Sequence, residues 1–558
     1  MKRTSLYQII LLMFVFAACS KSKFEEYYQN PSSTSTTTPE KQWTGFNQDM
    51  VGYESPQYYA YFVEWQTTAL NFTQVTAYQN IAKRYEPLFQ YAAGDDKWNH
   101  YYDFMTQYRN FVSVYSALAP TAQAQYRIFK ITADIHLFDE TQKMVDTYGD
   151  LPWSKAGLIT TNGGNIAASY ATYDKAADIY QTMLDSLQGY AGELNTIATS
   201  SPLTSAISTI FKNQDFMNQG SVSQWQKYCN SLRIRMLMRV SGTSQFSGRA
   251  NTEIASILAD PTTYPICNGG STAAGVFGSG ASGYTDGVYL VPVTSNSAFR
   301  SSLNTPTGGG LVGWGYADRT TKTMIDTLVN NNDPRLHLLF QPGSASADSI
   351  YGLDESLDAG TQSALLTGNK IALYNYFITC STLLPVQYFT SSEVQFLIAD
   401  YYTNVAPNSA LAQKAYEAGI TNSINWYSWL YASSDSKYPI NGSYVYSAPT
   451  NAQISAYISS SNISWSKAST TAQQNELIGL QKWINYNVFQ PNEVWSEVRR
   501  TGFPTLTFVP DNTSTLAPTP SNRFYYPVNE VLYNTANYNA ATNSGATNIP
   551  MTKIFWQP

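Results

Sequence analysis

The stretch "PNEVWSEVRRTGFP", Pro491–Pro504, carries a full set of signals for one short helix. Pro491 suits the first helical position, because its ring fixes φ near the helical value and its missing N–H would be unpaired there. Glu493 lies in the first turn and two arginines lie in the last, where each charge favours the helix dipole. Gly502 and the proline that follows end the helix. Such explicit signals predict a domain whose elements are mainly helical.

Further helices are predicted on both sides of this stretch. The evidence is long runs without proline, or apolar residues that recur at helical spacing. The predicted helices cover Tyr58–Arg84, Trp98–Ala117, Ala122–Thr147, Tyr173–Leu187, Thr321–Asn330, Leu411–Tyr431 and Gln473–Tyr486.

The segment "SVSQWQKYCNSLRIRMLMRVSG" has a clear apolar stripe at helical spacing. Its members are Trp225, Cys229, Leu232, Met236 and Val240. We interpret Cys229 as a small core residue, because it lies within the stripe. Further along the chain, Thr390 and Glu393 have the spacing of a capping box before an apolar run, which predicts another helix start.

Two regions lack these helical signals. Pro261–Gly315 is crowded with glycine, serine and threonine, and the C-terminal fifty residues are rich in asparagine, threonine and proline. Long loops inside a compact body are usually functional or disordered. The sequence therefore predicts a body with many helices and a large irregular, loop-rich portion.

The N-terminus indicates where the protein resides. The apolar run Ile9–Ala18 is too short to span a membrane, and its basic start is typical of a secretory signal. Two alanines directly before Cys19 resemble a bacterial lipobox, so Cys19 is the predicted lipidated residue. We predict a signal peptide over 1–18, a polar Ser/Thr/Pro-rich tether over 19–42 and a folded body over 43–558.

Composition limits the function. The chain has 558 residues, 43 tyrosines, only 13% charged residues and a net charge of −6, which argues against nucleic acid as a partner. A neutral, hydroxyl-rich and aromatic surface suits neutral polar ligands. There is no P-loop, GxSxG or HExxH motif, no CxxC pair, and only three histidines. No catalytic residue, metal site or cofactor is predicted.

Seven short motifs occur in one order along the chain. They are "YGDLPWSKA" (Tyr148–Ala156), "WQKYCNSLRIRMLMR" (Trp225–Arg239), "DPRL" (Asp333–Leu336), "SSEVQFLIAD" (Ser391–Asp400), "QKWINYNVFQPNEVWSEVRRTGFP" (Gln481–Pro504), "RFYYPVNEVLYNTANYNAA" (Arg523–Ala541) and a final "IFW". Together they resemble the SusD/RagB family of nutrient-binding outer-membrane lipoproteins, in its SusD-like second group. The resemblance covers essentially all of the chain that follows the lipobox.

This resemblance implies a fold, a place and an activity. The fold is all-α, with helix pairs of tetratricopeptide type and an irregular loop-rich face. The place is the outer membrane, through a lipid anchor, with the body exposed at the cell surface. The protein would not be an enzyme. It would capture oligosaccharide, or in some members peptide, and deliver it to a SusC-like TonB-dependent transporter.

Two other functions stay open from the residues alone. One is a glycoside hydrolase or lyase on an α-helical scaffold, because a pair of carboxylates needs no sequence motif. The other is a helical-repeat adaptor that binds only protein. We interpret the arginines of the opening stretch as part of the scaffold, with Arg499 or Arg500 paired to Glu497 or Glu530.

The predicted ligand contacts are aromatic, because flat rings cover the apolar C–H faces of a neutral polar ligand. Trp314 ranks first, because its glycine neighbours leave its ring uncovered. A second patch combines Trp98 with Tyr101 and Tyr102 near a helix start. The other candidates lie in the glycine-rich region and are Tyr264, Phe277, Tyr284, Tyr289 and Tyr316.

Overall fold

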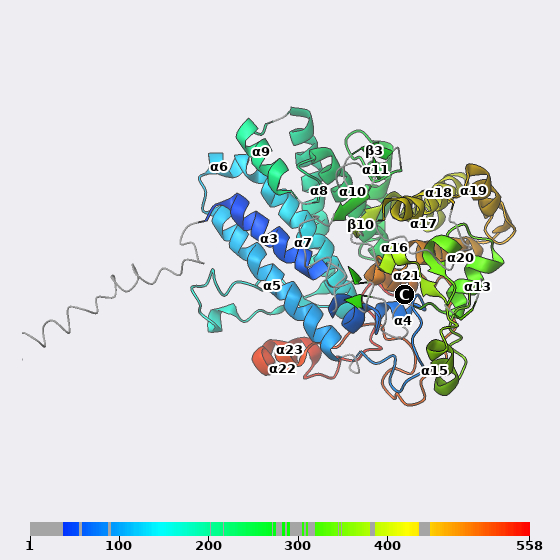
Figure 1. The fold of residues 1–558 in the computed structure, drawn as a ribbon. Helices are drawn as coiled ribbons and strands as arrows, with labels where there is room; N and C mark the ends of the chain where they lie inside the picture. Colours follow the sequence, from blue (N-terminus) through cyan, green and yellow to red (C-terminus); the bar gives the residue numbers. More distant parts are fainter. Residues whose placement is uncertain are drawn as a thin grey trace, which may run out of the picture.

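The computed structural model is mostly helical, as the sequence predicts (Figure 1). The predicted signal peptide and Cys19 lie outside the described residues. The structure describes residues 37–54, 59–87, 91–200, 202–215, 217–269, 272–274, 282–284, 287–290, 304–305, 309–310, 319–343, 345–346, 349–379, 385–434 and 447–558.

The N-terminal half consists of packed helices. In Figure 1, α3, α5 and α7 lie side by side, and α10 packs against α8. The helices of this half are α3 (Pro39–Glu54), α4 (Ala69–Phe72), α5 (Tyr91–Ser116), α6 (Pro120–Gln125), α7 (Arg127–Tyr148), α8 (Ala176–Ser200), α9 (Ser205–Gln214), α10 (Val222–Val240) and α11 (Ser247–Ala259), with a π-helix η1 (Tyr59–Trp65) and a 3-10 turn η2 (Ala167–Ser169).

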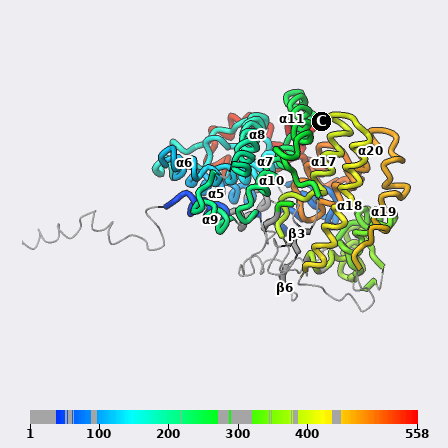
Figure 2. The backbone as a smooth tube through the Cα atoms, turned by 90° about the horizontal axis from the view of Figure 1, so that it is seen from above, coloured from blue at the N-terminus to red at the C-terminus, as the bar shows by residue number. Residues whose placement is uncertain are grey.

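The C-terminal half continues the helix pairs. Helix α17 packs against α18, α20 and α10, so that α10 joins the two halves (Figure 2). The helices here are α13 (Lys322–Asn330), α14 (Leu336–Leu339), α15 (Ala359–Thr367), α16 (Tyr376–Thr379), α17 (Ser391–Asn404), α18 (Ser409–Ser433), α19 (Asn451–Ile458), α20 (Thr471–Tyr486), α21 (Pro491–Thr501), α22 (Val528–Tyr533) and α23 (Thr535–Thr542), with a 3-10 turn η3 (Trp465–Lys467).

The described strands are short and pair in twos, all antiparallel. They tie loops to the helical body. The pairs are β1 (Leu151–Pro152) with β2 (Tyr173–Asp174), β3 (Thr272–Ala274) with β4 (Ser282–Tyr284), β5 (Gly287–Leu290) with β10 (Val386–Thr390), β6 (Asn304–Thr305) with β7 (Gly309–Gly310), and β8 (Phe340–Gln341) with β9 (Leu373–Tyr374).

Most predicted helices are confirmed. The opening stretch forms α21, with Pro491 at its start and Gly502 in the left-handed conformation at its end. The apolar stripe of α10 is buried along its whole length, and Cys229 is a free thiol in the core. These helices carry all their signals locally, which is why the sequence locates them well.

The prediction of one helix over Tyr58–Arg84 is wrong. The described part of this region holds η1, then the single turn α4, and then extended chain. Polar side chains compete for the backbone here: the Thr73 hydroxyl donates to the carbonyl of Ala69 at 2.7 Å. Beyond it, Thr76 pairs with Thr320 as an isolated bridge. Local hydrogen bonding and this distant partner together end the helix.

The capping box predicted at Thr390 is only half formed. The Thr390 hydroxyl accepts the backbone N–H of Glu393 at 3.2 Å, as expected. The Glu393 carboxylate, however, pairs with Arg235 of α10 at 2.6 Å instead of returning to the helix start. A buried arginine is the stronger partner, because it neutralises the charge of the carboxylate as well as donating hydrogen bonds to it.

Buried charges join five helices, and we call this set the ionic core. Arg235 of α10 bridges Asp139 of α7 at 2.9 Å and Glu393 of α17, and Arg239 of the same helix pairs with Glu493 of α21. The remaining members, from α17, α20 and α21, are Asp400, Lys482, Glu497 and Arg500, with Lys482 2.6 Å from Glu497 and 2.9 Å from Asp400.

Arg500 closes the ionic core at the end of α21. Its guanidinium pairs with Asp400 and, at 2.7 Å, with Glu497, which confirms the predicted Arg500–Glu497 pair. Burial alone would raise the pKa of Glu497, but Arg500, Lys482 and Arg239 hold it well below its usual value. Arg499 instead donates to the backbone carbonyls of Asp146, at 2.8 Å, and Asn522.

We expect Arg500→Ala to lower the free energy of unfolding by about 3–5 kcal/mol, because the buried carboxylates of Asp400 and Glu497 would lose the guanidinium that they share. Arg127→Ala is the matched control, since it removes a half-exposed pair with Glu193 and should cost at most about 1 kcal/mol. Urea denaturation of both variants measures the difference. Equal losses in the two variants would contradict a structural role for the buried pair.

Candidate functional site

A groove of about 600 Å³ opens between residues 98–103 of α5, the loop around residues 152–171 and α22. In Figure 1, α22 and α23 lie beside one end of α5. We call this hollow the α5–α22 groove. Its size falls in the range of about 300–1,000 Å³ that is usual for small-molecule sites.

Two of the predicted aromatic residues form the floor of the groove. Trp98 is 4% exposed, and its ring centre lies 4.9 Å from that of Tyr102. The Tyr102 hydroxyl donates to the carbonyl of Pro152 at 2.8 Å. The Trp98 indole hydrogen-bonds the Glu530 carboxylate. Both rings are therefore held in place before any ligand arrives.

Two exposed tyrosines stand at the rim of the groove, and sequence reasoning missed both. Tyr170 is 53% exposed and Tyr533 is 70% exposed, which is unusual for side chains of this size. Asn534 joins the two segments that carry them, because its amide donates to Ala171 at 3.0 Å and to Glu530 at 2.9 Å. The rings belong to irregular chain and to a short helix, where no apolar periodicity marks them.

The polar lining of the groove consists of amides and two carboxyl groups. Asn99 and Asn529 supply side-chain amides to the lining of the groove, as Asn534 does. Glu530 is largely buried, which raises its pKa, and it also accepts a hydrogen bond from Tyr173 at 2.7 Å. Asp103 is exposed. Rings that cover C–H faces, together with amides that exchange hydrogen bonds with hydroxyls, suit a neutral polar ligand.

The other residues predicted to contact the ligand do not gather in one described site. Tyr101 lies in the core instead of the groove, fully buried, with its hydroxyl 2.8 Å from that of Thr141. Tyr264 is half-buried against the core, and the Arg233 guanidinium lies 5.7 Å from its ring. Tyr284 belongs to β4 and Tyr289 to β5. Phe277, Trp314 and Tyr316 lie outside the described residues, so the prediction for them stays open.

A second hollow, of about 590 Å³, lies between the end of α13 and α19. Its lining includes Asn331, His337 and Gln453. Tyr457 also lines it, but that ring is buried and its hydroxyl lies 3.2 Å from Arg335. No exposed tyrosine or tryptophan is among its described lining residues, so this hollow lacks the ring wall of the α5–α22 groove.

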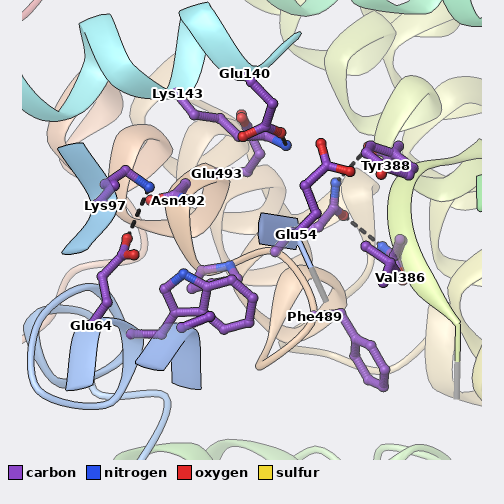
Figure 3. Close-up of a pocket in the computed structure, with 15 residues that line it drawn as sticks. Glu54, Glu64, Lys97, Glu140, Lys143, Val386, Tyr388, Phe489, Asn492 and Glu493 are labelled. Atoms are coloured by element: carbon purple, nitrogen blue, oxygen red, sulfur yellow. Dashed lines mark hydrogen bonds and ion pairs between the residues drawn. The ribbon is translucent and has the colours of Figure 1, made fainter. Parts of the chain in front are cut away.

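A third, much smaller cavity of about 60 Å³ lies inside the molecule, between α3, η1, α7 and β10 (Figure 3). Glu64 and Lys97 pair across it at 2.9 Å. Glu54 hydrogen-bonds Glu140, and burial raises the pKa of each to about 8. Lys143 pairs with Glu140. We call this hollow the acid cavity.

The acid cavity does not fit glycoside hydrolysis. Two-carboxylate hydrolases keep their carboxyl groups at least about 5 Å apart, so that a sugar or a water fits between them. Here the two groups hydrogen-bond each other directly, in a space too small for a sugar ring. Within the described ranges, no grouping of His, Cys, Asp and Glu could hold a metal ion.

The fold is a body of paired helices that carries a groove lined by aromatic rings. The chain belongs to the SusD-like family, since the family model described as "Starch-binding associating with outer membrane" matches residues 35–527. No curated protein matches the sequence.

Solved structures share the fold. A chitin-binding protein is 22% identical, with a TM-score of 0.67 over 93% of this chain and 100% of its own. A SusD homologue from Bacteroides fragilis is 17% identical, with a TM-score of 0.69 over 93% and 100%. A chitin-binding SusD homologue from Flavobacterium johnsoniae is 17% identical, with a TM-score of 0.67 over 92% and 98%.

The acid cavity predicts a pH dependence of stability. An unfolded glutamate has a pKa near 4.5, whereas Glu54 and Glu140 have pKa values of about 8 in the fold. Between these values the folded state holds more protons, so stability falls as the pH rises. His136, 3.1 Å from Glu54, has a pKa that burial lowers to about 4. The titration of His136 makes stability rise with pH, but only below its unfolded pKa of 6.5.

We expect Glu54→Gln to flatten the loss of stability between pH 6.5 and 8 by about 1–2 kcal/mol, because the amide needs no proton and lets Glu140 ionise against Lys143. Denaturant unfolding at several pH values measures this. Glu417→Gln on α18, outside the cavity, should keep the parent's slope. A parent whose stability is flat over this window would show that the two carboxyl groups share no proton.

Proposed function

We propose that this chain is a cell-surface lipoprotein that binds oligosaccharide nutrients at the outer membrane. It then delivers them to a SusC-like TonB-dependent transporter. The family description supports the outer-membrane setting and a carbohydrate ligand. Two structures with the same fold are described as chitin-binding, which supports the same class of ligand.

The observation that carries the proposal is the pair of exposed tyrosines over an aromatic floor with amides at its edge. Tyr170 and Tyr533 leave most of their rings uncovered at the rim of one groove, with Trp98 and Tyr102 beneath them. Sugars present apolar C–H faces and a ring of hydroxyls, and these match an aromatic wall and an amide edge respectively. A peptide is the second ligand class, because its side chains can also stack on tyrosine.

The lipid anchor is part of the proposal. No described helix is both long and apolar enough to cross a membrane. A thioether-linked lipid on Cys19, followed by the polar tether, would hold the body near the membrane while leaving it free to meet the transporter. Two or more acyl chains are needed for stable anchoring.

Cys19→Ser should abolish membrane attachment, because the serine hydroxyl cannot form the thioether that carries the lipid. Detergent phase partitioning of cell extracts, before and after the substitution, measures this. Cys229→Ser is the matched control, since that thiol is buried in α10 and carries no lipid in this proposal. If the Cys19 variant still partitions with membrane lipid, the anchor lies elsewhere.

Tyr533→Ala should weaken oligosaccharide binding by about 1–3 kcal/mol, a usual loss for an aromatic contact, with little change in melting temperature. Calorimetric titration against chitin-, starch- and cellulose-derived oligomers and short peptides measures the loss. Tyr351→Ala is the control, because that tyrosine is 56% exposed but does not line the groove.

Trp314→Ala in the same titrations separates the two predicted binding surfaces. A loss at Trp314 with none at Tyr533 would move the ligand site from the groove to the glycine-rich region. Equal affinity in all variants would remove both surfaces. No binding across the panel would favour the protein-binding adaptor, and turnover of a glycan would favour the hydrolase.

A further inference from the structure

The charges around the α5–α22 groove have one sign. Its described lining includes the carboxyl groups of Asp103 and Glu530, but no lysine, arginine or histidine. Two cations near it are paired with other groups. Arg109 donates to the carbonyls of Trp153, at 2.7 Å, and Ala156, at 3.0 Å, from behind the loop. Lys175 pairs with Asp150 at 2.8 Å.

The carboxyl groups of Glu530 and Asp103 have different roles in the groove. Glu530 is half-buried, and its oxygens already accept hydrogen bonds from Tyr173, Asn534 and Trp98. It therefore holds the floor and the α22 segment together. Asp103 of α5 is exposed, and it forms no hydrogen bond or ion pair with another side chain among the described residues. Its charge is free to act on whatever enters the groove.

Another carboxyl group lies near Asp103. The pKa of Asp49 in α3 is raised, first by burial and then by the charge of Asp103. His100 acts to lower the same pKa. The positive end of the α5 dipole is at Tyr91, and this effect fades within about one turn. Asp103 lies more than two turns beyond that start, so the helix dipole does not offset its charge.

We infer that the groove selects uncharged oligosaccharides and rejects anionic ones, such as uronate- or sulfate-bearing glycans, with Asp103 as the excluding group. This inference rests on the proposed function. A neutral sugar can donate its hydroxyls to the free carboxylate, whereas an acidic sugar at the same place sets two like charges together. At separations of a few ångströms near a protein surface, such repulsion lowers affinity on the order of 3- to 30-fold.

The test compares two ligands that differ only in charge. The probes are the tetramers of N-acetylglucosamine and of glucose, each with a counterpart oxidised at C6 to the uronate or carrying one sulfate at that position. Titrations of the parent at 20 mM and 500 mM salt measure the affinity ratio of neutral to anionic ligand. We expect a ratio of about tenfold at low salt, and a smaller one at high salt, because added salt screens the repulsion.

Asp103→Asn should reduce the low-salt ratio to about twofold or less, chiefly by improving the affinity for the anionic ligand. Asp326→Asn is the matched control, since it removes one exposed negative charge on α13, outside the groove, and should leave the ratio unchanged. Salt dependence provides a readout that a merely structural role of Asp103 would not move.

The outcomes separate this inference from the proposed function. If the neutral ligand binds and Tyr533→Ala weakens it, but Asp103→Asn leaves the ratio unchanged, the selection is wrong and the binding site stands. If the anionic ligand binds the parent as tightly as the neutral one, the selection is again wrong. If neither ligand binds, the proposed function fails and the inference fails with it.

Discussion

Buried charges determine how the helices of this protein pack. A buried arginine between carboxylates from other helices is stable only in one arrangement, because any shift leaves a charge without a partner. Arg235 and Arg239 of α10 fix this arrangement against α7, α17 and α21. Apolar packing alone tolerates small slips, whereas a slip of α10 would part these buried charges from their partners, which is strongly destabilising.

The groove depends on that core through the C-terminal segment. Arg499 of α21 holds the carbonyl of Asn522 and that of Asp146 in α7. The backbone N–H of Phe524 then donates to Thr147 at 2.9 Å, and the Tyr526 hydroxyl donates to Asp150 at 2.7 Å. These bonds hold the chain against the end of α7 before α22 begins. Tyr533, the last residue of α22, lies at the rim of the groove. The proposed ligand surface is thus held in place by the helical scaffold.

The sequence locates the scaffold better than the site, for a physical reason. Helices such as α10 and α21 carry their own apolar stripes, caps and terminal charges, so local signals suffice. The Trp98 patch is found because rings cluster near a helix start, yet Tyr101 turns into the core, since only packing decides which ring of a cluster is covered. Tyr170 and Tyr533 belong to chain without periodicity. Their exposure follows from contacts such as those of Asn534, which no local pattern encodes.

Hydrogen exchange followed by mass spectrometry, with and without a bound oligosaccharide, tests most directly whether the groove is a ligand site on a rigid scaffold. Added protection should be confined to peptides covering the start of α5, residues 156–171 and α22, with α10, α17 and α21 exchanging equally slowly in both states. Protection only around α13 and α19, or a broad change across the ionic core with none at the groove, would contradict a preformed site between α5 and α22.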